Sequence, residues 1–317
     1  MTRRRPWRGP LGRRRGALTW ILATLAAAGC NPGDPDPPLP AAGAAYATEL
    51  AAWHRDRVAA LARPDGWLSL VGLYWLAEGG QSSGSDPAND LVFPEMMPAF
   101  LGTFERQGGR VRVRLRPGVE AHVDGIPFTE GELASDADGV PTVLTVGRWR
   151  LQIVARDGRY GVRLRDPESP ARTGFAGIER FPADSSWRVP ARLEPYDPPR
   201  ALAVPTVLET ATQMPSPGAL VFWRDGRSFR LDAVAEPGDT EWWLIFADAT
   251  SGTATYGGGR FLYVPAPGAD GTTLIDFNRA HNPPCAFTPF ATCPLPPPQN
   301  RLDLAVTAGE RAYGTGH

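Results

Sequence analysis

Hydrophobic and polar positions alternate with a period of two over much of the chain, which predicts short antiparallel strands. The clearest case is 110–115, where every second residue is apolar and the others are arginine, as in a half-buried strand. The same pattern predicts further strands at 142–146, 149–154, 160–164, 219–223, 228–234, 241–246, 260–263 and 302–307. Asp-Gly pairs at 124–125, 138–139 and 157–158 are typical of hairpin turns. The predicted fold class is therefore mostly β, with antiparallel sheets.

One segment follows a helical period instead. Tyr46, Leu50, Trp53 and Leu61 recur at roughly helical spacing, and Pro64-Asp65-Gly66 ends the pattern. We expect a helix over 45–64, and no other substantial helix after it. The 34 prolines and 35 glycines also favour short strands joined by turns over long helices.

The first thirty residues have the pattern of an export signal. Seven arginines precede the apolar run 17–25, and small residues lead to Cys30. This order resembles a bacterial lipoprotein signal, in which Cys30 would be lipidated after cleavage of residues 1–29. The alternatives are a free cysteine beyond an ordinary signal, or an uncleaved anchor. We therefore expect an exported protein anchored by lipid to a bacterial membrane, facing the periplasm or the cell surface.

Charge and composition exclude several kinds of chemistry. The chain has 33 basic and 34 acidic residues, and loss of residues 1–29 removes seven arginines, leaving 26 against 34 and a net charge of −8. This balance argues against nucleic acid as a partner. All the basic residues are arginine, so a Schiff-base lysine, a P-loop lysine and a Ser-Lys dyad are excluded.

The chain after the signal divides by composition into five segments. Residues 30–44 read as a flexible tether, and 45–64 as the helix. A first β unit at 65–168 precedes a Pro-rich junction at 169–205. A second β domain at 206–317 carries a loop rich in Asn, Pro and Cys.

Several sequence blocks together resemble a bacterial family of unknown function. The blocks are Gly66–Leu76, Thr255–Leu262, Asp276–Ala286, Cys293–Pro296, Asn300–Leu302 and Ala308–Glu310. In this order they are similar to the family called DUF1684. The resemblance implies membership and no activity.

The first β unit also looks like a degenerate forkhead-associated (FHA-like) domain. Gly84–Phe93 is similar to the first loop of that domain, Val123–Gly125 to its Asn-Gly turn, and Leu144–Gly147 to its closing strand. Such domains bind phosphothreonine through an arginine of the first loop, where Ser85 stands here, and the Ser-x-x-His that should follow is absent at 98–102. Without the arginine there is no bidentate phosphate clamp. We expect the β-sandwich without binding of a phosphothreonine peptide.

Polar side chains gather in the second β domain and are candidates for a ligand site. They are Tyr256, Arg260, Asp276, Asn278, His281, Asn282 and Asn300, together with Asp248. In one interpretation Asn and Asp orient a polar ligand and Arg260 supplies a charge. In the other the loop is structural: Asp and Asn cap turns, and Arg260 pairs with Asp248 or Asp276.

Two cysteines eight residues apart lie in the same loop. A disulfide between Cys285 and Cys293 is the leading interpretation for an exported protein. The rivals are a metal site with His281 and Asp276, whose spacing fits no standard zinc pattern, and a Cys-His nucleophile pair. The sequence predicts no metal ion and no cofactor.

Two function classes remain. The first is a membrane-anchored binding or accessory module of the cell envelope, for a polar small molecule, a glycan or a protein. The alternative is an envelope enzyme, such as a hydrolase, with a site around Asp276, His281, Cys285 and Arg260. No catalytic residue, substrate or reaction follows from the sequence.

Overall fold

The structure, a computed structural model, describes residues 43–314. The predicted signal at 1–29, the lipidation site Cys30 and nearly all of the 30–44 tether lie outside the described residues. Within 43–314, no helix combines the length and the apolar character that crossing a bilayer requires.

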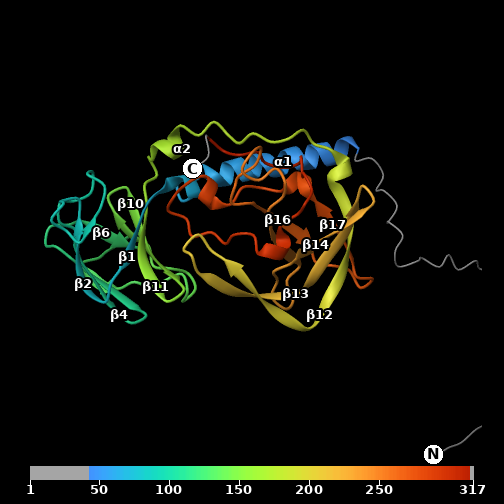
Figure 1. Ribbon diagram of the computed structural model, residues 1–317. Coiled ribbons are helices and arrows are strands. Elements are labelled where there is room, and N and C mark those ends of the chain that lie inside the picture. Colours follow the sequence, from blue (N-terminus) through green and yellow to red (C-terminus); the bar gives the residue numbers. More distant parts are fainter. Residues whose placement is uncertain (1–42, 315–317) are drawn as a thin grey trace, which may run out of the picture. The chain divides into compact units, whose positions relative to one another are not determined.

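Two sheets in the first part of the chain enclose one core (Figure 1). The six-stranded sheet has the order β1 (Leu70–Leu76), β11 (Arg159–Arg165), β10 (Trp149–Arg156), β9 (Leu144–Val146), β6 (Ala121–Val123) and β7 (Ile126–Pro127). The five-stranded sheet has the order β3 (Leu91–Val92), β2 (Gly79–Gly84), β4 (Gly102–Gln107), β5 (Arg110–Leu115) and β8 (Glu130–Glu132). Buried side chains of both sheets, such as Phe104 and Leu151, share this core, so the unit is a β-sandwich.

The alternation in the sequence accounts for this sandwich. Along β5 the apolar residues are buried and the arginines exposed, as predicted, and Arg110 and Arg112 pair across the sheet with Glu132 and Glu130. The Asp-Gly pairs at 124–125 and 157–158 have positive φ at both residues, which a two-residue hairpin of the type I′ class requires.

The second part of the chain adds a four-stranded and a two-stranded sheet. The four-stranded sheet has the order β14 (Arg227–Asp232), β13 (Ala211–Arg224), β12 (Arg188–Pro205) and β17 (Thr272–Asp276). Strands β15 (Glu241–Phe246) and β16 (Arg260–Pro265) pair with each other. Their core includes Phe222, Phe246 and Phe277. The prediction of a mostly β fold with antiparallel sheets is confirmed.

Two local predictions were wrong. The Pro-rich stretch 169–205, expected to be a junction, holds α2 (Pro170–Thr173) and the 3₁₀ helix η2 (Ser185–Trp187) before β12, which pairs with strands on both sides. A register shift between Pro195 and Arg200 lets β12 accommodate its prolines. No continuous strand forms at 302–307. The Leu302 N–H donates to the Ala247 carbonyl and the Ala249 N–H to the Leu304 carbonyl, but Val306 is held by the side chains of Arg260 and Asp248. Strand β17 was not predicted.

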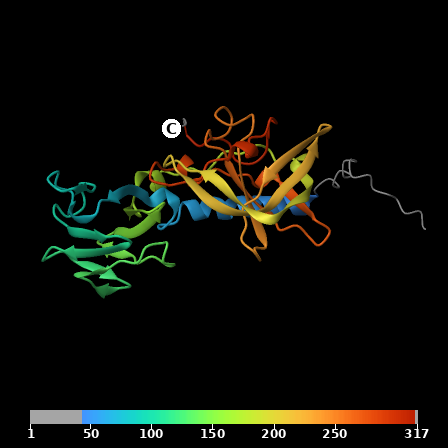
Figure 2. The same cartoon turned by 60° about the horizontal axis from the view of Figure 1, so that its bottom comes forward.

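Helix α1 (Ala44–Leu61) occupies the segment where the helical period was seen. It lies along the second part of the chain (Figures 1 and 2). Its Tyr46 hydroxyl donates to the Asp276 carboxylate, and its Arg57 pairs with Glu310 at 3.1 Å. The helix is therefore fixed by polar contacts to residues more than 200 positions away, in addition to the burial of Leu50 and Leu61.

We expect Gly309→Ala to destabilise the fold much more than Gly147→Ala. Both glycines have positive φ, but a Cβ on Gly309 would lie 2.4 Å from the Ala280 carbonyl oxygen, whereas the space beside Gly147 is open. The left-handed conformation alone costs about 1–2 kcal/mol, and the backbone clash should raise the loss at Gly309 to about 3 kcal/mol or more. Urea unfolding of both variants measures the difference, and equal losses would contradict it.

Candidate functional site

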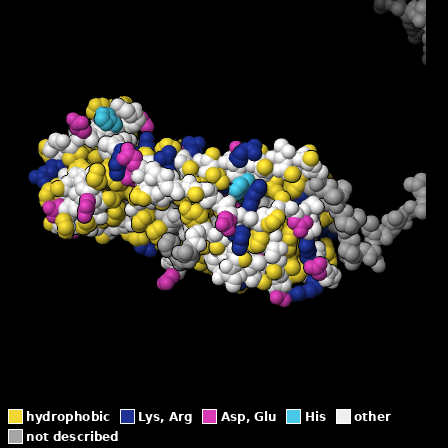
Figure 3. All heavy atoms as spheres, turned by 90° about the horizontal axis from the view of Figure 1, so that it is seen from above, with side chains coloured by type: hydrophobic (Ala, Val, Ile, Leu, Met, Phe, Trp, Pro, Cys, Tyr) yellow, Lys and Arg dark blue, Asp and Glu magenta, His cyan; other side chains and the backbone are white. Residues whose placement is uncertain are grey.

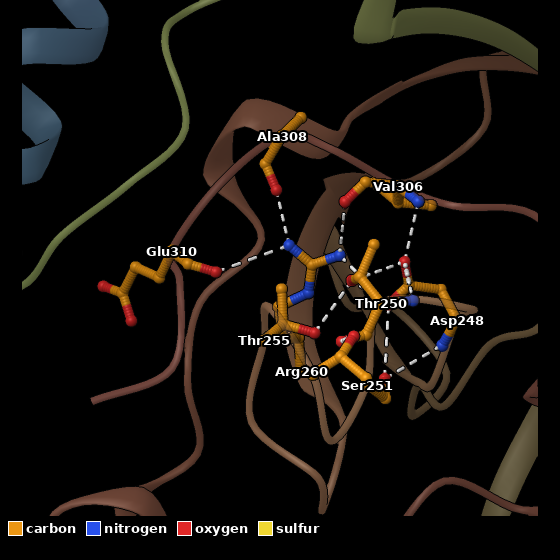
Figure 4. Close-up of polar contacts among 9 residues, drawn as sticks. Asp248, Thr250, Ser251, Thr255, Arg260, Val306, Ala308 and Glu310 are labelled. Atoms are coloured by element: carbon orange, nitrogen blue, oxygen red, sulfur yellow. Dashed lines mark hydrogen bonds and ion pairs between the residues drawn. The ribbon is translucent and has the colours of Figure 1, made fainter. Parts of the chain in front are cut away.

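The largest fully buried side chain in the described chain is Arg260, at the start of β16 (Figure 4). Its Nη2 donates to Asp248 Oδ1 at 3.2 Å and to the Val306 carbonyl at 2.9 Å, and its Nη1 donates to the carbonyl of Ala308. Asp248 also accepts from the hydroxyls of Thr250 and Ser251. The Arg260–Asp248 ion pair is thus surrounded by polar groups of the protein itself.

Burial lowers the pKa of the Arg260 guanidinium, and the charges of Asp248 and Glu310 oppose this shift. Both Arg260 and Asp248 have 0% exposed side chains. A ligand therefore has no open approach to them. Of the two interpretations of Arg260, the geometry supports the structural one, with Asp248 and not Asp276 as its partner.

Asp276 and Asn278 hold helix α1 and the segment before β12. Asp276 accepts from Tyr46 and from the Asn278 side-chain amide at 3.0 Å. Asn278 exchanges two further hydrogen bonds with the backbone of Asp184. Burial and the Asp276 carboxylate raise the pKa of Tyr46, so the hydroxyl keeps its proton and remains a donor. These residues fix neighbouring segments to one another.

His281 lies in an aromatic enclosure. Its ring packs against those of Trp53, Phe261 and Tyr263, and its Nδ1 lies 3.1 Å from the Arg279 carbonyl oxygen. Burial, assisted by the charge of Arg57, lowers the pKa of His281 to about 3. The imidazole is therefore neutral at physiological pH and donates to the Arg279 carbonyl.

Asn282 and Asn300 are also bonded to the chain itself. The Asn282 amide N–H donates to Glu310 at 2.7 Å, and its side chain donates to the Arg311 carbonyl. Asn300 accepts from the Asp232 N–H and donates to the carbonyls of Asp232 and Ile245. Burial raises the pKa of Glu310, while Arg57 and the Asn282 N–H act in the opposite direction.

The candidates for an enzyme site have separate environments. Within residues 43–314 no hydrogen bond or ion pair joins any two of the side chains of Arg260, Asp276, His281 and Cys285. Asp276 faces α1, His281 faces aromatic rings, and Arg260 is enclosed. The structure therefore does not bring the proposed hydrolase residues together.

The two loop cysteines are free thiols in the structure, so the predicted disulfide is not present. They nevertheless face each other: the Cys285 N–H lies 3.1 Å from Cys293 Sγ, and the Cys293 N–H lies 3.3 Å from Cys285 Sγ. Tyr256 lies close enough for the two cysteines to add to the rise that burial causes in its pKa. The described residues contain no group of three potential metal ligands.

Arg163 on β11 is the residue that the sequence reasoning missed. It is 6% exposed, and its Nε and Nη2 have no hydrogen-bond partner. Its guanidinium lies over the Trp67 ring at 5.6 Å and is an electrostatic neighbour of both cysteines. The alternation along 160–165 places it on the outer face of the sandwich, but burial of that face could not be read from the sequence.

We expect Arg260→Ala to lower the free energy of unfolding by about 3–5 kcal/mol, because it leaves the buried Asp248 carboxylate without its cation. Asp276→Ala should cost about 1–3 kcal/mol through lost hydrogen bonds. The matched control is Arg227→Ala, whose ion pair with Asp303 is exposed and should contribute less than about 1 kcal/mol. If thermal and urea unfolding show all three variants to be alike, the structural role is wrong and a solvent-open site gains support.

Stability should fall on acidification because of His281. Its folded pKa lies below the ordinary value, so its contribution is complete above about pH 6.5 and is lost as the pH falls toward 3. We expect a loss of about 3–5 kcal/mol over this window, and a smaller loss in His281→Phe. The raised pKa of Glu310 makes its contribution to stability grow on acidification, which is the opposite direction. Glu310 is present in both the parent protein and His281→Phe, so its effect cancels when their pH profiles are compared. Identical pH profiles by urea unfolding would contradict the role of His281.

Comparisons with known proteins give a family. The family model described as "Protein of unknown function (DUF1684)" matches residues 173–311, so the Gly66–Leu76 block lies outside the matched range. No curated protein matches the chain. The solution NMR structure of an uncharacterized protein of Haloarcula marismortui is 33% identical, covers 46% of this chain and 80% of that chain, and has a TM-score of 0.38. The chain belongs to the DUF1684 family of proteins of unknown function.

Proposed function

We propose that this protein is a lipid-anchored binding module of the cell envelope, and that it binds a protein partner through one end of its N-terminal β-sandwich. The anchor rests on the signal pattern before Cys30. The mode of binding rests on a single surface feature, a cavity of about 650 Å³ between loops of the sandwich.

The cavity has an apolar lining with charges beside it. Met96, Met97, Val119, Val146 and Trp149 contribute apolar side chains, while Glu120 and Arg148 also border it. Apolar patches beside polar side chains are typical of protein–protein sites. A glycan would find few hydrogen-bond partners on methionine and valine side chains, which is why we favour a protein segment with an apolar side chain.

The loop 84–101 presents further apolar side chains to solvent. Met96 is 72% exposed, Val92 45% and Phe100 40%. Figure 3 shows apolar side chains on the surface of this unit among acidic and basic ones. Exposed methionine is flexible and polarizable, which suits recognition of a partner.

Hydrogen bonds fix the backbone of this loop before any partner arrives. Ser85 Oγ donates to the Met97 carbonyl at 2.9 Å, and the Asn89 side-chain amide donates to the Ala99 carbonyl at 2.8 Å. A fixed loop loses little entropy on binding. Ser85 stands where an FHA-like domain would need its arginine, and here it holds the loop instead. This supports an apolar partner over a phosphothreonine peptide.

Photo-crosslinking in the cell envelope tests the proposal. The full chain carries p-benzoylphenylalanine at Phe100, which is exposed on the loop that supplies Met96 and Met97 to the cavity, or at Val140 as a control. Val140 is 92% exposed and lies outside both that loop and the cavity lining. We expect a protein adduct of defined mass from position 100, absent from position 140 and lost when Met96→Asp is added. Met96 is exposed, so this change should alter stability by less than about 0.5 kcal/mol. No adduct, or the same adduct from both positions, would refute the proposal.

A further inference from the structure

Arg163 is a buried cation, and two of its nitrogens have no hydrogen-bond partner. Burying a cation without an anionic partner is costly. Its neighbours Arg156 and Arg165 repel it, and the nearby carboxylate of Asp136 is already bonded to two nitrogens of Arg156. Burial and these two arginines lower the pKa of Arg163 to about 10. An anion beside Arg163 would compensate for this cost.

Among the described residues, the cysteine pair is the further ionisable group that acts on Arg163. Arg156 connects β10 to the cysteine loop, because its Nε donates to Thr292 Oγ1 at 3.1 Å, next to Cys293. Arg163 acts electrostatically on both thiols. A disulfide carries no charge, so it would leave Arg163 uncompensated. A thiolate would supply the missing anion.

The two cysteines differ in the way that such a thiolate requires. Cys285 is half-buried in a turn, and Cys293 is 5% exposed in an apolar cluster. A hydrogen bond from the Cys293 thiol, together with Arg163, lowers the pKa of Cys285, against the effect of burial. The same hydrogen bond and burial raise the pKa of Cys293. Besides Arg163, Tyr256 from the turn before β16 is an electrostatic neighbour of the pair. The charged neighbours of Arg163 itself are Arg156, Arg165 and Asp136 from the sandwich.

We propose that Cys285 and Cys293 form a redox-active dithiol, in which a small hydroperoxide oxidises Cys285 and Cys293 resolves it into a disulfide. In the first step the Cys285 thiolate sulfur attacks one peroxide oxygen and the O–O bond breaks. Cys285 becomes a sulfenic acid, and the leaving oxygen takes up a proton as water or an alcohol. In the second step the Cys293 sulfur attacks the Cys285 sulfur, the S–S bond forms, and the S–O bond breaks. The hydroxide leaves as water with the proton of Cys293, so the pair gives up two electrons in total.

Arg163 has the role of a charged neighbour that stabilises the reduced, thiolate form. Stabilising that form makes a disulfide more oxidising and easier to reduce. The pair should therefore cycle, unlike a permanent structural disulfide. This inference does not depend on the proposed binding surface, which lies on different loops.

The experiment uses the full chain, reduced and purified in detergent, with hydrogen peroxide as the oxidant. Peptide mass spectrometry follows Cys285, Cys293 and Cys30 separately. We expect one equivalent of peroxide to convert the 285–293 pair into a disulfide that glutathione reverses under native conditions. Cys293→Ser should accumulate a sulfenic acid at Cys285 that dimedone traps, and Cys285→Ser should leave Cys293 unreactive. A disulfide that glutathione cannot reduce in the folded protein, or equal reaction of both thiols, would overturn the proposal.

The pH dependence of Cys285 alkylation tests the role of Arg163. Arg163→Gln should move the profile to higher pH by about one unit, which lowers the rate near neutral pH about tenfold, and Arg163→Lys should restore it. Arg165→Gln is the matched control, because Arg165 also lies on β11 but is only half-buried and donates to the Gly66 carbonyl and Ser69. Thermal melting verifies that each variant is folded. If a variant does not fold, the order of reactivity of the two cysteines in the parent chain still decides the outcome. An unchanged profile in folded Arg163→Gln would refute the role of Arg163.

Discussion

The second part of this protein depends on how one buried arginine is satisfied. Arg260 is inaccessible to water, so its charge needs the Asp248 carboxylate and its donors need the carbonyls of Val306 and Ala308. A buried ion pair stabilises little in itself, but loss of one partner is costly. The segment around 306–308 therefore has one favourable position, although no strand pairing holds it there. The Arg260 side chain thus fixes the 306–308 backbone, as hydrogen bonds between strands fix the backbone elsewhere in the fold.

The same constraint extends from this segment to the helix. Gly309 follows Ala308 with a left-handed backbone that lets the chain pass close to the Ala280 carbonyl, and Glu310 then reaches the Asn282 N–H and Arg57 of α1. Through these contacts the first described helix and the last described segment are fixed to the same loop. The residues that looked like a ligand site are thus the polar framework that joins these segments.

Periodic burial could be read from the sequence, and pairing between distant segments could not. Alternation located β5, β10 and β11 because each has one face in a core, and the Asp-Gly turns followed from their left-handed backbone. It failed at 302–307, where backbone pairing stops after Leu304 and Val306 bonds to the side chains of Arg260 and Asp248. The density of Asp, Asn and Arg indicated a loop with many polar contacts, either to a ligand or within the chain. The partners of these polar residues include Tyr46 and Arg57 of α1, which lie over 200 positions away in the sequence and could not be inferred from it.

Arg260 and Arg163 differ in how their buried charge is compensated, and this difference distinguishes a structural arginine from one beside a reactive group. Both are removed from water, and burial lowers the pKa of each. Arg260 has a carboxylate of its own and several carbonyls, and only its Nε lacks a hydrogen-bond partner. Arg163 has a neighbouring carboxylate, that of Asp136, which is bonded to Arg156, and two of its own nitrogens have no partner. Its site is complete only when the neighbouring Cys285 carries a negative charge, which ties the electrostatics of the sandwich face to the oxidation state of the cysteine loop.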